Sequence, residues 1–167
     1  TPAEMVDPDV ETVSEEDALP EADALSWAGA VDPGTTLLLA GPPMTGKRAL
    51  LYRLVAADRA PDRGRLLVTT RKTGDAVEGE YREVHPDVPG ERLAVVDCVS
   101  DQYGVDLRES ERRRYAHDPG DLTGIGIGVT EFMRQFHEDP DVNGVEVGLH
   151  NLSTMLMYAD LRRVYQF

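Results

Sequence analysis

The sequence contains a single cysteine, and only two of its 17 basic residues, Lys47 and Lys72, are lysines. One cysteine excludes an intrachain disulfide, and the apolar residues before Cys98 predict a buried, unreactive thiol. No apolar run approaches the roughly 18 residues that a membrane-spanning helix needs, and no signal peptide opens the sequence. We therefore expect a cytoplasmic protein that has no membrane partner.

Positive charge is also scarce. The 31 acidic and 17 basic side chains give a formal net charge of −14. Nucleic acid is not an expected partner, because binding that is independent of base sequence needs a basic stripe. An acidic surface poor in lysine resembles the surfaces of proteins from extreme halophiles, in which high salt screens self-repulsion. An acidic protein from a GC-rich genome is the alternative interpretation.

Clusters of chemically reactive side chains are few. The four histidines are not paired at a spacing that suits a metal, so no zinc site is expected. No G-x-S-x-G turn is present, which argues against serine nucleophile chemistry. The one basic cluster, Arg112 to Arg114, stands beside Glu109 and Glu111. A solvated loop is favoured there over a contact with phosphate or nucleic acid.

What the sequence does contain is a phosphate-binding pattern, G-x-x-x-x-G-K, at residues 41–47. The apolar run at residues 35–40 predicts a buried strand before it, and apolar residues at helical spacing predict a helix over residues 48–57 after it. The two glycines let backbone N–H groups point at a phosphate, while the helix terminus and the lysine ammonium add positive charge. The predicted nucleotide-binding residues are Gly41, Pro42, Pro43, Met44, Thr45, Gly46, Lys47 and Arg48.

The motif departs from a magnesium-binding loop at its last position. A serine or threonine usually follows the lysine and ligates Mg²⁺ through its hydroxyl, but Arg48 cannot ligate a cation. We therefore expect a loop that holds a nucleotide and is poorly equipped to hydrolyse it. A glycine- and proline-rich turn with no ligand is the alternative interpretation.

Strands and helices are predicted to alternate along the rest of the chain. Residues 1–24 are acidic and rich in turn-forming residues, which predicts a flexible tail with a weak helix over 15–25, and residues 25–167 form the domain. The expected strands cover residues 65–70, 92–98 and 145–149, and the expected helices cover residues 75–84, 129–137 and 153–167. The alternation predicts an α/β fold, a parallel sheet with flanking helices.

Two segments between these elements are interpreted as loops. Residues 100–121 are polar and charged, which predicts a flexible loop with a helical piece around residues 108–115. Gly124, Gly126 and Gly128 are expected in a loop that leads into the helix at 129–137. A second phosphate loop is not favoured at these glycines, because no strand stands immediately before them.

From about residue 31 to residue 167, the chain resembles the KaiC/RecA-like P-loop ATPases. The resemblance rests on the loop at 41–48, the predicted strands around it, and the later strand that ends in His150-Asn151-Leu152-Ser153. It is closest to the short haloarchaeal KaiC-like proteins sometimes labelled transducer-like or HTR-like. The resemblance implies a RecA/KaiC-like P-loop fold, a nucleotide partner, assembly into rings or filaments, and a signalling or regulatory role.

The resemblance also implies a C-terminal truncation, because the family fold continues with further strands after the one at 145–149. The expected helix at 153–167 is apolar on most of its surface, so its own sheet, a second copy of the chain, another protein or a missing segment should cover it. A homo-oligomer or a protein partner is therefore expected.

Two further positions depart from the family pattern. His150 stands where the family has an aspartate that orders Mg²⁺, which makes it a degenerate form of that position. Arg71 and Lys72 stand where the family has glutamates that activate water. Because phosphoryl transfer depends on positioning and charge neutralisation around Mg²⁺, these replacements together with Arg48 predict a pseudo-ATPase that binds ATP or ADP, and they argue against a Mg²⁺ requirement.

The sequence leaves several alternatives open. Arg48, Arg71 and Lys72 would neutralise the phosphates without a metal if the second strand ends beside the loop, but Arg71 and Lys72 would instead pair with Asp75 and Glu78 if they are solvated. A lone histidine such as His150 is more often structural. The chain could also be an active ATPase whose Mg²⁺ is held by Ser153, Asp97 or a neighbouring subunit, or a protein-interaction scaffold that no longer binds nucleotide.

Overall fold

The structure is a computed structural model that describes residues 32–55, 61–104, 107 and 110–167. The tail predicted at 1–24 and its weak helix lie outside these residues. The chain divides into two units, residues 1–37 and 38–167, and every helix and strand described below belongs to the second unit.

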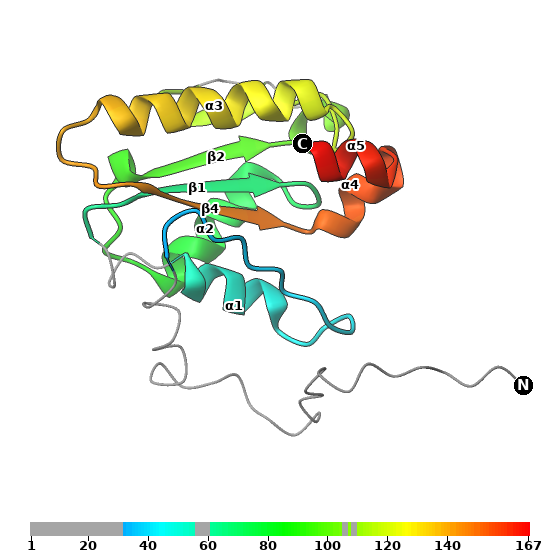
Figure 1. Ribbon diagram of the computed structural model, residues 1–167, viewed down its shortest axis with the longest axis horizontal. Coiled ribbons are helices and arrows are strands. Elements are labelled where there is room, and N and C mark those ends of the chain that lie inside the picture. Colours follow the sequence, from blue (N-terminus) through cyan, green and yellow to red (C-terminus); the bar gives the residue numbers. More distant parts are fainter. Residues whose placement is uncertain (1–31, 56–60, 105–106, 108–109) are drawn as a thin grey trace, which may run out of the picture. The chain divides into compact units, whose positions relative to one another are not determined.

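The second unit is built on a sheet of four parallel strands, as the alternating pattern predicts (Figure 1). The strands are β1 (Gly64–Thr69), β2 (Leu93–Asp97), β3 (Arg113–Tyr115) and β4 (Val145–His150), in the order β3-β2-β1-β4. All six residues of β1 and all five of β2 are buried, which is typical of parallel strands covered on both faces. The predicted strands at 65–70, 92–98 and 145–149 are therefore confirmed.

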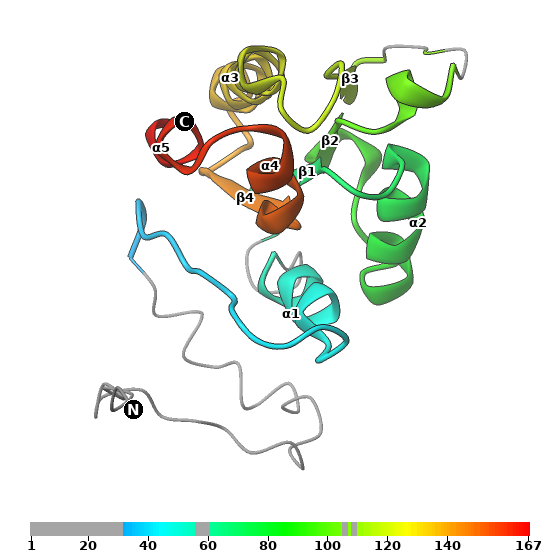
Figure 2. The same ribbon diagram turned by 90° about the vertical axis from the view of Figure 1, so that its right-hand side faces the viewer.

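Helices cover both faces of this sheet (Figure 2). Among the described residues, the α-helices are α1 (Lys47–Leu54), α2 (Gly74–Val84), α3 (Leu122–Glu138), α4 (Leu152–Tyr158) and α5 (Leu161–Gln166), and the short 3₁₀ helices are η2 (Gly90–Arg92) and η3 (Ser100–Tyr103). On one face, α3 contacts β1, β2 and β3; on the other, α1 contacts β4 and α2 contacts β2. The helices predicted after the loop and at 75–84 are confirmed, the first ending at Leu54.

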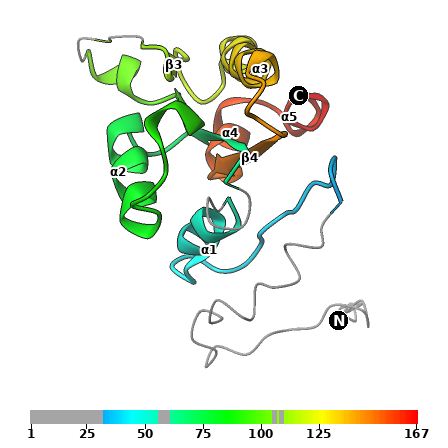
Figure 3. The ribbon, with the colours of Figure 1, turned by 90° about the vertical axis from the view of Figure 1, so that its left-hand side faces the viewer.

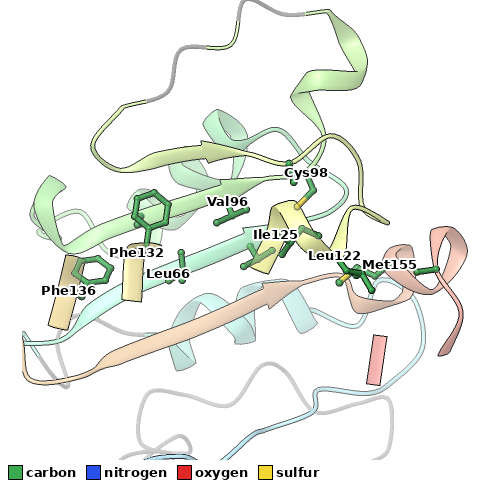
Figure 4. Close-up of a cluster of buried hydrophobic side chains, with 12 residues drawn as sticks. Leu66, Val96, Cys98, Leu122, Ile125, Phe132, Phe136 and Met155 are labelled. Atoms are coloured by element: carbon green, nitrogen blue, oxygen red, sulfur yellow. The ribbon is translucent and has the colours of Figure 1, made fainter. Parts of the chain in front are cut away.

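Two apolar clusters hold these layers together. Figure 4 shows the cluster under α3, where Ile125, Phe132 and Phe136 lie over Leu66 and Val96 of the sheet. The cluster under α1 and α2 is formed by buried side chains from both helices, from the segments that follow them, and from β1 and β2, namely Tyr52, Val55, Leu67, Val77, Tyr81, Val88, Leu93 and Val95. Burial of these side chains is the main stabilising contribution to the sheet–helix packing.

The strand predicted at residues 35–40 is wrong. These residues have no regular secondary structure, and the Leu38 side chain is 74% exposed. An apolar run supplies surface to bury, but a strand also needs a neighbouring strand in matching register. The apolar pattern of residues 35–40 carries no information about that neighbour.

The loop predicted around the three glycines is also wrong, because α3 begins at Leu122 and includes Gly124, Gly126 and Gly128. Asp121 caps the helix by accepting a hydrogen bond from the Gly124 N–H at 2.9 Å. A cap and a buried apolar face outweigh the low helix propensity of glycine here.

The remaining differences concern residues 100–121 and the C-terminal helix. The polar segment contains η3 and β3, so the helical piece predicted around 108–115 is wrong where it overlaps β3. The helix predicted at 153–167 is divided into α4 and α5. The second begins because the Asp160 side chain accepts a hydrogen bond from the Arg163 N–H at 3.0 Å.

Candidate functional site

The glycine-rich loop at residues 41–46 leads directly into α1. Gly46 has φ 79° and Met44 has φ 62°, so the backbone enters the left-handed region twice within three residues. Left-handed residues in such a turn rotate successive N–H groups toward a common side. Figure 1 shows this loop on the same side of the second unit as the carboxyl ends of β1 and β4.

The side chain of Lys47 folds back over this loop. Its Nζ atom donates to the Gly41 carbonyl at 2.7 Å, to the Pro42 carbonyl, and to Thr45 Oγ1 at 3.3 Å. The Thr45 hydroxyl donates in turn to the Pro42 carbonyl at 2.9 Å. These bonds hold the ammonium group of Lys47 at the mouth of the loop.

The backbone N–H groups at the end of the loop differ from the carbonyl groups of Gly41 and Pro42, which accept hydrogen bonds from Lys47 and Thr45. The first bond of α1 runs from the Leu50 N–H to the Gly46 carbonyl at 3.0 Å. Within the described part of the chain, no hydrogen bond that we find is donated by the backbone N–H of Thr45, Gly46 or Lys47. No acidic residue lies in the first turn of α1. These N–H groups and the positive end of α1 therefore lack an internal anion of their own.

The carboxyl ends of β1 and β4 lie next to each other, since Thr69 pairs with His150 in the sheet. Thr70 is buried, and its hydroxyl lies 3.0 Å from the His150 carbonyl and 2.7 Å from the Asn151 carbonyl. The Thr69 hydroxyl donates to the carbonyl of Lys72 at 2.7 Å. These hydrogen bonds fix the turn after β1 and place Lys72 near the end of β4.

A carboxylate that the sequence did not single out, Glu80 of α2, connects this turn with α1. Its Oε2 atom lies 3.1 Å from Arg48 Nε and accepts a hydrogen bond from the Tyr52 hydroxyl at 3.1 Å. Its Oε1 atom accepts a hydrogen bond from Lys72. Figure 3 shows the helices α1 and α2 side by side on one face of the sheet. Glu80 therefore joins cations from two segments that are far apart in the sequence.

The pKa of Glu80 reflects these contacts. Burial on its own would raise the pKa, but the hydrogen bond from Lys72 and the charge of Arg48 together outweigh it and lower the pKa below the ordinary glutamate value. Glu80 is therefore ionised near neutral pH, and it forms ion pairs with both cations. The apolar residues Val77 and Tyr81 mark the buried face of α2, so their spacing alone would have placed Glu80 at the margin of that face.

His150 lies beside the same charges. Only 9% of the residue is exposed, and its Nδ1 atom has no hydrogen-bond partner among the described residues. Burial lowers the pKa of His150, the charges of Arg48, Lys72 and Arg71 lower it further, and the charge of Glu80 opposes them. The imidazole is therefore kept neutral near pH 7 in this structure.

This direction predicts how stability depends on pH. A histidine whose pKa is lowered on folding binds fewer protons in the folded state, so the protein should lose stability as the pH falls below the unfolded histidine value, about 6.5. Urea unfolding between pH 5 and 8 should therefore show a smaller pH dependence for His150→Gln than for the wild type. His137→Gln, an exposed histidine on α3, is the matched control. Equal pH dependence in all three proteins would contradict the prediction.

The predicted site residues are thus brought together in part. Lys47 and Arg48 follow the loop, and Lys72 and His150 lie within the charge cluster centred on Glu80. Arg71 is exposed and contributes charge at longer range. The pairing of Arg71 and Lys72 with two acidic residues of α2, Asp75 and Glu78, is wrong, because both of those carboxylates bind Arg113 instead.

The basic cluster at 112–114 does not form a solvated loop. Arg113 is buried in β3 and pairs with α2, while Arg114 pairs with Glu131 of α3. The Arg112 guanidinium lies 4.9 Å from the centre of the Phe136 ring and donates to Gln135 at 3.1 Å. The arginines therefore attach the edge strand to the helices on both faces of the sheet.

The alternative magnesium ligands differ in what they contact. Asp97 is fully buried and accepts four hydrogen bonds, two at each carboxylate oxygen, from Gly74, Val99 and Ser100. Its lone pairs are occupied, so Asp97 is not positioned to ligate a metal. Ser153 is exposed on α4. Among the described residues, no group of three or more histidine, cysteine or acidic side chains is arranged to hold a metal ion.

Cys98 behaves as predicted from its apolar neighbours. It is fully buried, and burial together with the charge of Asp97 raises the pKa of its thiol to about 12. The thiol is therefore protonated and unreactive at neutral pH.

None of the described helices combines the length and the apolar composition that crossing a membrane requires.

The C-terminal helices are only partly covered by the sheet, as their apolar sequence suggested. Met155 is buried and Val164 packs against the cluster under α3. Exposed apolar side chains remain on α4, on α5 and at the chain end, namely Leu156, Met157, Tyr158, Leu161, Tyr165 and Phe167. An apolar surface of this kind is compatible with the expected oligomer or protein partner.

These features define an α/β protein in which a glycine-rich turn and a lysine begin a helix beside a parallel sheet. The chain belongs to a family of unknown function, DUF7504, whose family model matches residues 34–167. Comparison with curated proteins gave no match, and comparison with solved structures gave none either.

Proposed function

We propose that this protein binds the phosphate groups of a nucleotide, ATP or ADP, and serves as a regulatory or signalling module with little or no hydrolysis. The observation that carries this proposal is the convergence on Glu80 of Lys72 and of Arg48, which directly follows Lys47 of the loop. The backbone N–H groups of that loop and the dipole of α1, which carry no net charge, would add hydrogen bonds and a favourable potential for a phosphate. The resemblance to the KaiC/RecA-like ATPases favours a nucleotide over other phosphate esters.

The charges support binding without a metal. Arg48 occupies the place where a hydroxyl would ligate Mg²⁺, and it points to a carboxylate in α2. Guanidinium and ammonium groups neutralise phosphate oxygens directly, so the fixed cations replace part of the role of Mg²⁺. If no metal positions and neutralises the phosphates, hydrolysis would lack most of its transition-state stabilisation.

Ligand-dependent stability is the test of this function. Thermal unfolding in high-salt buffer with ATP or ADP at about 100 times the dissociation constant should show stabilisation of about 2.7 kcal/mol. The stabilisation should occur without Mg²⁺ and should disappear in Lys47→Ala, which removes the ammonium group over the loop. Arg134→Ala, which removes an exposed cation from α3 on the other face of the sheet, should keep it.

The other outcomes identify the alternatives. A stabilisation that requires Mg²⁺ would favour an active ATPase with unusual metal ligands. No stabilisation by either nucleotide would favour a scaffold that has kept the fold and lost the ligand. The exposed apolar side chains of α4 and α5 would then be the first surface to examine for a protein partner.

A further inference from the structure

We propose that Glu80 is the internal anion of the phosphate site: its carboxylate holds Arg48 and Lys72 in place, and the terminal phosphate of a nucleoside triphosphate displaces it. This inference rests on the proposed function and assigns a specificity-determining role to a residue outside the glycine-rich motif. The carboxylate contacts both cations and the phenol of Tyr52.

The exposure of the three charged groups makes displacement feasible. The side chains of Glu80, Arg48 and Lys72 are 27%, 45% and 34% exposed. Partly exposed ion pairs contribute little net stability, since water solvates both partners when they separate. A terminal phosphate offers three oxygen acceptors and close to two negative charges, so it can replace one carboxylate at both cations.

Tyr52 gives the displaced carboxylate a remaining partner. Burial and the nearby charge of Glu80 raise the pKa of Tyr52, so the phenol keeps its proton and continues to donate a hydrogen bond. Tyr52 is itself buried within the cluster under α1 and α2. Glu80 can therefore release Arg48 and Lys72 while its Oε2 atom still accepts the hydrogen bond from the Tyr52 hydroxyl.

His150 is the second observation that points to an anionic ligand. Its Nδ1 atom is buried and has no partner among the described residues, although buried ring nitrogens are usually hydrogen-bonded. Four charged groups act on the imidazole: Arg48 from α1, Glu80 from α2, and Arg71 and Lys72 from the turn after β1. A phosphate oxygen in this position would accept a hydrogen bond from His150 in the tautomer that carries its proton on Nδ1, a bond that Glu80 does not accept here.

The arrangement predicts selectivity for the number of phosphates. A ligand whose last phosphate reaches Arg48 and Lys72 must compete with Glu80, whereas a shorter ligand held by the loop alone leaves Glu80 in place. Removing the negative charge of Glu80 should therefore strengthen the binding of ATP and inorganic triphosphate much more than the binding of ADP. The expected gain for the triphosphates is on the order of tenfold.

Titration calorimetry without Mg²⁺, at one fixed salt concentration, tests this expectation with ATP, inorganic triphosphate and ADP. Glu80→Gln keeps the shape of the side chain and removes its charge. Glu83→Gln removes an equal charge from an exposed position on the same helix, so it controls for the change in net charge. We expect about a tenfold gain in ATP affinity for Glu80→Gln and less than a threefold change for Glu83→Gln.

The outcomes separate this inference from the function on which it rests. If the wild type and Lys47→Ala bind ATP equally, or neither binds it, the proposed function fails. If binding depends on Lys47 but Glu80→Gln gains no more than Glu83→Gln, only the role of Glu80 is overturned. Glu80→Asp, which shortens the side chain and keeps the charge, covers a failure of Glu80→Gln to fold: it should also bind ATP more tightly, and wild-type or weaker affinity would overturn the proposal.

Discussion

Replacing Asp97 by alanine should destabilise the protein by about 4 kcal/mol, which is a large fraction of the roughly 5–15 kcal/mol by which a typical domain is stable. The Asp97 carboxylate accepts hydrogen bonds from the Gly74 N–H at 2.6 Å and the Val99 N–H at 2.8 Å. It also accepts bonds from the Ser100 N–H at 2.9 Å and the Ser100 hydroxyl at 2.5 Å. The variant would leave these buried donors without an acceptor.

Urea unfolding measures this effect through the shift of the midpoint at a nearly constant slope. Asp101→Ala is a suitable control, because Asp101 lies nearby in η3 and its partner, His117, is largely exposed. That variant should lose far less stability than Asp97→Ala, because a solvent-exposed pair contributes little. A loss of similar size in both variants would contradict the structural role of Asp97 and would reopen the possibility that its carboxylate is available to a ligand.

The second large effect is expected at Gly64, the first residue of β1. A Cβ atom at this position would lie 2.6–2.8 Å from three ring atoms of Phe136, and that ring is fully buried. The ring cannot give way without moving other core side chains, so Gly64→Ala should cost about 2–3 kcal/mol. The midpoint of thermal unfolding, compared at equal protein concentration, measures the loss.

Gly79→Ala provides the opposite control for the same substitution. Nothing lies within 4 Å of a Cβ atom at Gly79, which is an interior residue of α2. Alanine there should raise stability by about 0.5–1 kcal/mol, since it reduces the entropy of the unfolded chain and favours the helix. A stabilised Gly64→Ala variant would show that the packing of Phe136 against β1 is looser than described.

The parts of the fold that sequence predicts well are those in which local pattern and burial agree. The strands β1, β2 and β4 coincide with short apolar runs, and α2 begins with a threonine cap, Thr73, before an amphipathic pattern. Residues 35–40 show the limit of this rule, because an apolar run cannot specify its neighbour in a sheet. The start of α3 shows another limit, because one cap at Asp121 outweighs three glycines.

The candidate site also contains residues that the sequence predicts and residues that it does not. Its loop, Lys47 and Arg48 could be found from spacing, and Lys72 could be placed nearby only on the condition that the second strand ends beside the loop, as in the family that the chain resembles. Glu80 could not, since its importance arises from the packing of α2 beside α1. The cations predicted to pair with the acidic residues of α2 are wrong for a similar reason. Asp75 and Glu78 are close to Lys72 in sequence, but β3 brings Arg113 to them.

The position of the two lysines has a practical consequence for chemical labelling. Lys47 lies over the glycine-rich loop and Lys72 lies against Glu80, and the chain has no other lysine side chain. An amine-reactive reagent modifies lysines over the whole surface of most proteins, but in this chain its lysine targets are residues 47 and 72 alone, and its other amine target is the α-amino group. Mass spectrometry of the acylated chain can therefore measure protection at residues 47 and 72 separately, without any engineered probe.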